Sequence, residues 1–295
     1  DAKWLLDMWQ LRHFNLENSS IVEGCTNYAA EATVSVAETG VKRVLIPKAN
    51  LSTFIVGSSV SLSSTSRGGT RTFWNKKILS IETVTVNETE YTAVNIDTDT
   101  AFNTTAGYYL STMPWVSGTT EALPGHSDGS IVSATSGKYP ARIAGIEILN
   151  GAYAIGIEPL WNVAVNSAGG MDYEAYYCRD STKLAGELTN YTASGIKFVG
   201  AAVNWQYIKE FFKTKLGILL PSVFGGRSSG WYKSAFAVDS SAGVRVPWRF
   251  GHLRTGGVAG LTCASGGNWP SSSLWTGAPR LGGASKLRGE WVEDD

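Results

Sequence analysis

Hydrophobic and polar residues alternate with a period of two over much of the segment from residue 29 to residue 110. The alternating runs are separated by Gly, Asn, Asp and Ser, and they cover residues 32–37, 43–47, 54–63, 78–86 and 91–97. A period of two puts successive side chains on opposite faces of a strand, and the polar clusters are typical of turns. The pattern predicts a small all-β barrel or sandwich over residues 29–110.

Two other segments have apolar residues at helical spacing. The first, within residues 1–25, carries an apolar stripe and is followed by Gly24, a residue type common after the last turn of a helix. The second covers residues 204–217, where Gly217 supplies the stop signal. Its apolar side is formed by Trp205, Ile208, Phe211 and Phe212. The spacing predicts a core-packing helix in each segment.

The remaining segments predict loops and further strands. Residues 63–77 are rich in Gly and Arg and predict a hairpin-like loop, in which Arg67 and Arg71 are either solvated or able to bind an anion. Residues 112–130 have the composition of a loop throughout. Residues 141–165 alternate again and predict two or three strands.

The composition is that of a folded protein and narrows the choice of partners. Of the 295 residues, 43% are hydrophobic and 17% are charged, and the net charge is zero with the basic residues scattered. A protein that binds nucleic acid or an anionic membrane normally has a concentrated basic surface, so neither partner is expected. No apolar run approaches the roughly 20 residues that a membrane-spanning helix needs, and we expect no membrane insertion.

The sequence offers little for catalysis or metal binding. Its three histidines are far apart, and it has no phosphate-binding glycine motif and no Gly-x-Ser-x-Gly nucleophile motif. Cys25, Cys178 and Cys263 are also distant from one another, which predicts buried thiols rather than a zinc site. Glu147 and Glu158 fall on predicted strands, where a general acid and base can face each other, but such pairs also arise by chance. We expect no catalytic residue, no metal and no cofactor.

Residues 260–281 combine Trp269 and Trp275 with serines, glycines and an asparagine, and they carry almost no charge. Binding loops favour these residue types, because aromatic side chains bury a large area with few rotatable bonds while Ser, Gly and Asn adapt their hydrogen bonds. Gly/Ser/Trp segments also occur as structural loops in glycine-rich β folds, where Trp fills a local core. Composition alone leaves both interpretations open.

Longer strings in the chain point to a family. They cover residues 4–25, 34–50, 112–115, 137–153 and 247–283. Together they resemble tail-associated proteins of siphophages and of prophages of gut bacteria, whose C-terminal half has the C-type lectin fold. The last string also resembles the variable region of proteins diversified by retroelements, in which mutagenised codons fall on exposed loops of that fold.

The resemblance implies an α+β fold class. A C-type lectin-like domain of the formylglycine-generating-enzyme type is expected over residues 1–28 and 111–295, with the β domain of residues 29–110 inserted into it. Calcium-dependent sugar binding is not implied, because residues 268–270 read Asn-Trp-Pro and the calcium motifs of animal lectins are missing. Arg280 resembles a buried structural arginine of this fold.

The resemblance also assigns the ligand-binding positions. They are His252, Arg254, Thr255, Val258, Ser265, Asn268, Trp269, Ser271, Ser273, Trp275 and Thr276. In this assignment Trp269 and Trp275 are exposed because they form the contact surface, whereas Trp248 and Trp291 belong to the core.

The function implied by the resemblance is receptor binding by a phage tail protein. Its ligand is expected to be a host cell-surface protein or glycan, and its other partners to be virion tail proteins and further copies in a homotrimer. Its expected location is the virion, after assembly in the bacterial cytoplasm. One alternative is a structural tail or baseplate protein that uses the same segment for assembly. Another is an enzyme, since formylglycine-generating oxidases share the lectin fold. That chemistry needs a cysteine site, for which only Cys178 and Cys263 are candidates, and we expect no enzyme activity.

Overall fold

The computed structural model describes residues 28–116, 139–143, 146–148, 150–155, 159–200, 204–213, 219–225, 235–238, 241–249, 251–255, 263–272, 274 and 276–279. These residues divide into two compact units. The N-terminal unit contains the described residues from 28 to Ala152 and from His252 to 255. The C-terminal unit contains those from Tyr153 to Gly251 and from 263 to 279.

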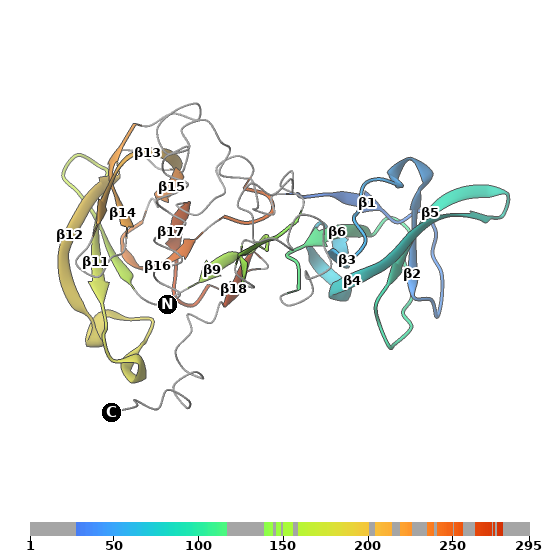
Figure 1. Ribbon diagram of the computed structural model, residues 1–295, viewed down its shortest axis with the longest axis horizontal. Coiled ribbons are helices and arrows are strands. Elements are labelled where there is room, and N and C mark those ends of the chain that lie inside the picture. Colours follow the sequence, from blue (N-terminus) through green and yellow to red (C-terminus); the bar gives the residue numbers. More distant parts are fainter. Residues whose placement is uncertain are drawn as a thin grey trace. The chain divides into compact units, whose positions relative to one another are not determined.

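The N-terminal unit is built on one six-stranded antiparallel sheet (Figure 1). Its strands follow the order β1-β6-β3-β4-β5-β2 across the sheet. They are β1 (Glu31–Thr33), β2 (Arg43–Pro47), β3 (Ser59–Thr65), β4 (Gly68–Val86), β5 (Thr89–Ile96) and β6 (Tyr109–Met113). The 3-10 helix η1 (Lys48–Asn50) follows β2, and β7 (Ala141–Ile143) pairs with β8 (Ile146–Ile148) in a separate two-stranded sheet.

Alternating side chains explain why the six-stranded sheet encloses a core. The core includes Val44, Ile46, Val60, Leu62, Ile78, Val94, Ile96 and Leu110. Those that share a strand lie two residues apart, as the period of a strand requires. The sheet edges approach each other after β1, where the amide of Ser35 donates to the carbonyl oxygen of Leu45 at 2.8 Å. Residues 43–47 form β2 as predicted, and residues 78–86 lie within β4.

A hairpin is present within residues 63–77 as predicted, but these residues are mostly strand rather than loop. The chain reverses in a tight turn at Ser66 and Arg67, and the residues from Gly68 onward belong to β4. Arg67 has a φ of 55° and Asn75 a φ of 50°, values in the left-handed region that turns and bulges use. The pairing of β3 with β4 shifts register along this stretch. The Gly and Arg residues therefore shape a bent hairpin.

The C-terminal unit is a second curled sheet (Figure 1). Eight of its strands follow the order β12-β11-β10-β16-β17-β15-β13-β14, while β9 pairs with β16 and β18. The strands are β9 (Tyr153–Ile155), β10 (Leu160–Val165), β11 (Met171–Tyr177), β12 (Thr192–Gly200), β13 (Asn204–Lys213), β14 (Leu219–Phe224), β15 (Ala235–Val238), β16 (Gly243–Arg249), β17 (Ala264–Asn268) and β18 (Gly277–Pro279).

Aromatic side chains fill the inside of this curled sheet. The rings of Trp161 and Phe198 lie 5.2 Å apart between centroids, and Tyr173 stacks on Phe198 at 4.8 Å. Phe236 of β15 meets the same ring edge-on at 5.3 Å. Phe198 of β12 also contacts Phe224 of β14 at 5.7 Å, which brings the two edge strands together. Paired rings of this kind add stability beyond the burial of their area.

A second core lies on the opposite face of β10 and β16. It includes Leu160 and Trp248, and the segment with the 3-10 helices η2 (Ser181–Lys183) and η3 (Leu188–Asn190) packs against it. Trp248 is almost completely buried, so its predicted place in the core is confirmed.

The expected α+β class is wrong. Strands predominate in the described part of the chain, where the helical turns are three short 3-10 helices. Residues 204–213 of the predicted helix form β13 instead, which pairs with β14 and β15, and residues 214–217 lie outside the described ranges. Aromatic residues favour a strand when neighbouring strands are present, and this pairing outweighs a weak helical spacing. The helix-containing lectin-like architecture does not fit these residues, and the helix expected within residues 1–25 lies outside the described ranges.

Candidate functional site

The predicted ligand-binding residues are divided between the two units. His252, Arg254 and Thr255 belong to the N-terminal unit, and the C-terminal unit contains Ser265, Asn268, Trp269, Ser271 and Thr276. The other three predicted positions, Val258, Ser273 and Trp275, lie outside the described residues, as do Arg280 and Trp291. The site therefore has to be considered as two separate groups.

Trp269 is the large exposed residue of the C-terminal group. It follows the last residue of β17, and the amide of Ser272 donates to its carbonyl oxygen at 2.9 Å to close a turn. The residue is 47% exposed. The guanidinium carbon of Arg245 lies 3.5 Å from the centroid of the ring, so one face of the indole is covered. An exposed tryptophan is thus held in a fixed orientation.

Arg245 is itself held firmly in β16. Its side chain is fully buried, and its Nη2 donates to the carbonyl oxygen of Ser241 at 2.9 Å and to the Ser241 hydroxyl at 2.7 Å. In the sheet it lies opposite Trp161 of β10, at the margin of the aromatic core. The cation–π contact with Trp269 covers the guanidinium from the other side.

Gly243 is required for this arrangement. A Cβ atom at Gly243 would lie 2.8 Å from two carbons of the Trp269 ring and 2.9 Å from Nη1 of Arg245. The residue also has a φ of 134°, which a residue with a side chain rarely adopts. The absence of a side chain at this position therefore makes room for the indole.

The start of β17 anchors the turn to the core. A Cβ atom at Gly266 would approach Phe236 to 2.6 Å and Tyr173 to 2.9 Å, so the strand lies directly on the aromatic rings. Ser265 is only 9% exposed, and its hydroxyl accepts a hydrogen bond from the side-chain Nδ2 of Asn268 at 3.0 Å. Ser265 supports the turn from inside, whereas Trp269 and Ser271 are on its surface.

Leu274 is a second exposed apolar residue of the segment, and it is absent from the predicted positions. It is 55% exposed, five residues after Trp269. Pro270, which lies between Trp269 and Leu274 in the sequence, packs closely on Gly186. A Cβ atom at Gly186 would lie 2.6 Å from Cβ of Pro270. The position of Leu274 directly after three serines was the sequence feature that could have indicated an exposed apolar residue. Thr276 has a different role, because its carbonyl oxygen accepts from the amide of Tyr153 at 2.8 Å and joins the segment to β9.

The N-terminal group is a compact loop around Leu253. That residue is fully buried, and its amide donates to the carbonyl oxygen of Gly151 at 2.9 Å. The His252 amide donates to Oγ1 of Thr255 at 2.9 Å, and the Arg254 amide donates to Nδ1 of His252 at 3.0 Å. Burial, together with the positive charges of Arg254 and Arg67, lowers the pKa of His252 to about 4. At neutral pH the imidazole is uncharged and holds the loop closed.

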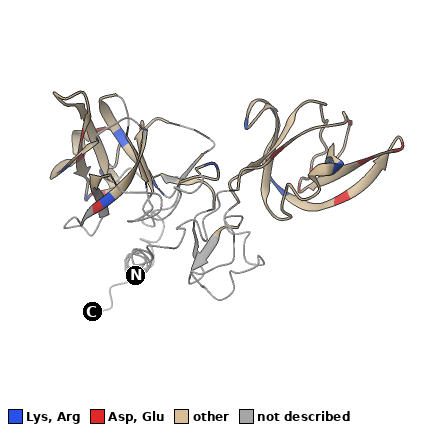
Figure 2. Cartoon of the chain, turned by 90° about the horizontal axis from the view of Figure 1, so that it is seen from above, with Lys and Arg blue, Asp and Glu red and all other residues tan. Residues whose placement is uncertain are grey.

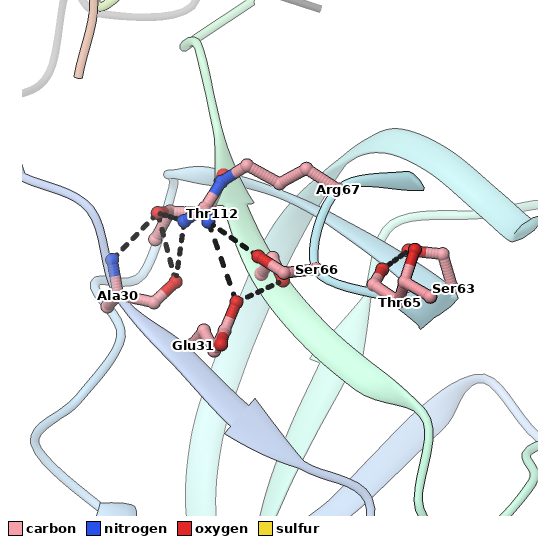
Figure 3. A network of polar contacts seen from close by, with 8 residues as sticks. Ala30, Glu31, Ser63, Thr65, Ser66, Arg67 and Thr112 are labelled. Atoms are coloured by element: carbon pink, nitrogen blue, oxygen red, sulfur yellow. Dashed lines mark hydrogen bonds and ion pairs between the residues drawn. The ribbon is translucent and has the colours of Figure 1, made fainter. Parts of the chain in front are cut away.

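Arg67 is a structural residue of the N-terminal unit (Figure 3). Its Nε donates to the carbonyl oxygen of Thr112 at 2.8 Å, and its Nη2 donates to the carbonyl oxygen of Ala30 and to Oγ1 of Thr112, each at 3.0 Å. Its Nη1 lies 3.6 Å from the carboxylate of Glu31. Burial lowers the pKa of Arg67 to about 10, so it stays protonated at neutral pH. These contacts tie the β3–β4 turn to β1 and β6.

The two arginines of the predicted loop differ, since Arg67 is buried and Arg71 is exposed. Arg67 makes the internal contacts described above, and Arg71 stacks over the ring of Trp74 at 3.8 Å. Charged residues are spread thinly over the described strands and form no continuous stretch of one sign (Figure 2).

The residues considered for catalysis do not form a site in the described part of the chain. Cys178 and Cys263 are both buried, and Cys178 donates to the carbonyl oxygen of Asp180 at 3.3 Å. Glu158 and Cys25 lie outside the described residues. Among the residues that are described, no three His, Cys, Asp or Glu side chains are grouped to hold a metal ion, and no helix is long and apolar enough to cross a membrane.

Comparisons of the chain with protein-family models, with curated proteins and with solved structures found no match. The candidate site is therefore defined by its own geometry, namely Trp269 exposed on a turn and stacked on the buried Arg245.

Proposed function

We propose that the chain is a phage tail protein that recognises a host-surface ligand through the turn around Trp269. The observation that carries this proposal is the exposure of a large indole on a rigid support. Burying an exposed tryptophan against a partner gives a large gain of apolar contact, and little conformational freedom is lost when the ring is already fixed. Tryptophan is accordingly among the residue types that dominate binding energies.

The assignment to a phage tail comes from the resemblance of the strings listed above, and it does not depend on the lectin-like fold. Several copies on one tail, as in the expected homotrimer, strengthen attachment through multivalency even when each contact is weak. The segment 247–283 is also proposed to be diversified by a retroelement. A reverse-transcriptase gene beside a near-copy of its codons, differing at adenines, is the expected finding in the surrounding genome.

Adsorption of phage particles tests the proposal. Particles carrying Trp269→Ala are expected to assemble in normal numbers and to adsorb to host cells at least about tenfold less well, the loss typical of a central binding residue. Trp205→Ala is the matched control, because Trp205 is 39% exposed on β13 in the same unit. Its removal is expected to leave adsorption unchanged.

The alternative, a structural tail or baseplate protein, predicts a different result. The exposed apolar residues Trp269 and Leu274 also suit contact with a neighbouring tail protein. In that case Trp269→Ala reduces the number of complete particles, while the particles that do form adsorb normally. Normal assembly together with normal adsorption would contradict both functions for this surface.

A further inference from the structure

The indole of Trp269 has two different faces. The guanidinium of Arg245 lies 3.5 Å from the ring centroid on one face, and Gly243 lies against the edge of the six-membered ring. The residue is nevertheless 47% exposed. Because one face and one edge are occupied, most of the exposed area belongs to the opposite face. The turn therefore presents a single flat aromatic surface with a cation behind it.

The cation changes what the outer face attracts. The face of an isolated indole is negative, which favours cations and the partly positive C–H groups of a sugar ring. Arg245 is fully buried, so water screens its charge weakly. Its charge reduces the negative potential of the ring and repels a second cation on the outer face. An electron-rich aromatic ring has a negative face, so it stacks more favourably on the outer face of the indole when the negative potential of that face is reduced.

The surroundings are also suited to an uncharged side chain. Residues 263–279 contain no Asp, Glu, Lys or Arg. Leu274 adds exposed aliphatic area in the same segment, and the hydroxyl of the exposed Ser271 is a neutral hydrogen-bonding group. We infer that the outer face of Trp269 binds the phenol ring of a tyrosine on a protein partner. This inference rests on the proposed function and makes the receptor a protein rather than a glycan.

A titration with small probes tests the inference directly. The ¹⁵N-labelled protein is titrated with p-cresol, with methyl β-glucoside and with tetramethylammonium, and the indole N–H signals of Trp269 and Trp205 are followed by NMR. At Trp269 we expect p-cresol to bind about fivefold more tightly than either other probe, in line with the usual strength of an aromatic pair. Trp205 is the internal control, because no guanidinium stacks on it among the described residues. There tetramethylammonium is expected to bind at least as well as p-cresol.

The variant Arg245→Met removes the charge and keeps an apolar chain of similar length. If it folds as judged by its NMR spectrum, the preference of Trp269 for p-cresol is expected to fall to the level at Trp205. The comparison of the two tryptophans in the unaltered protein decides the matter if the variant fails to fold. The inference is overturned if tetramethylammonium or the glucoside binds Trp269 as tightly as p-cresol, or if the preference persists in folded Arg245→Met.

Failure of the tyrosine inference can be distinguished from failure of the proposed function. Normal adsorption of Trp269→Ala particles refutes receptor binding at this surface, whatever the probes show. Lost adsorption combined with no preference for p-cresol refutes the tyrosine inference alone.

Discussion

Gly243→Ala is the sharpest test of how Trp269 is held. The added Cβ would lie 2.8 Å from the indole ring, so the ring has to swing outward and leave Arg245. A non-glycine residue at a φ of 134° costs about 1–2 kcal/mol in backbone strain. Loss of a partly desolvated cation–π contact costs about 1 kcal/mol more. The free energy of unfolding is therefore expected to fall by about 2–3 kcal/mol.

The two contributions are separated by a control and by a double-mutant cycle. Gly225 has a φ of 104° and open space where a Cβ atom would be, so Gly225→Ala is expected to show backbone strain alone. Urea unfolding gives the stability of both variants, and indole fluorescence reports the displaced ring. In a Trp269→Ala background, the extra cost of Gly243→Ala over Gly225→Ala is expected to shrink to the part caused by the close approach to Nη1 of Arg245. Equal costs for the two glycine variants in the unaltered protein would refute the seating of Trp269 against Gly243.

Two further predictions concern the N-terminal unit. Arg67→Met removes the hydrogen bonds of a buried guanidinium to the carbonyl oxygen of Thr112 and to that of Ala30, which keeps the Thr112 amide as a donor. We expect urea unfolding to show a loss of about 3 kcal/mol. No loss would show that the guanidinium does not tie the β3–β4 turn in place. His252 has a pKa of about 4 in the folded protein and near 6.5 when unfolded, so between these values the unfolded chain binds more protons. Stability is then expected to fall as the pH is lowered from about 6.5 to about 4, by about 1–2 kcal/mol after allowing for partial exposure of the ring. His252→Gln should remove this part of the pH dependence, and an unchanged pH profile in that variant would contradict the assignment.

The strands of the N-terminal unit were predictable because short apolar runs are separated by polar turn residues, even where a strand such as β3 or β6 is buried on both faces. Residues 43–47 form β2 with the predicted bounds, although its three central residues, Val44, Leu45 and Ile46, are all buried. The bent start of β4 was missed, because Gly and Arg in a row indicate a loop unless the partner of Arg67 is known. That partner includes the carbonyl oxygen of Ala30, 37 residues earlier in the chain.

The prediction of a helix over residues 204–217 was wrong for a different physical reason. Its aromatic residues have a spacing that suits a helix, but β14 and β15 lie beside it and pair with it. Local spacing cannot reveal a partner strand that comes later in the chain. The resemblance to a lectin-like fold also led to a helix-containing prediction, whereas the described residues of the C-terminal unit are mainly β-strands.

The candidate site was predictable in part. The residue types around Trp269 indicate a contact surface, but the support for the ring could not be read from them. Arg245 lies 24 residues earlier in sequence, and it reaches the indole because β16 and β17 are neighbours in the sheet. Leu274 was overlooked, since the residues around it are mostly serines.

The geometry also limits which positions of the C-terminal segment can change without loss of the fold. A side chain at Gly266 meets Phe236 and Tyr173, and a larger residue at Ser265 has to displace the hydrogen bond with Asn268. Ser271 is exposed on the turn, and Trp269 exposes almost half of its area. Within seven residues, the constrained positions Ser265 and Gly266 in β17 are thus followed by the exposed positions Trp269 and Ser271 in the turn. A binding surface whose ligand changes while its scaffold stays the same needs both kinds of position. Substitutions at Ser271 are therefore expected to alter binding without altering stability.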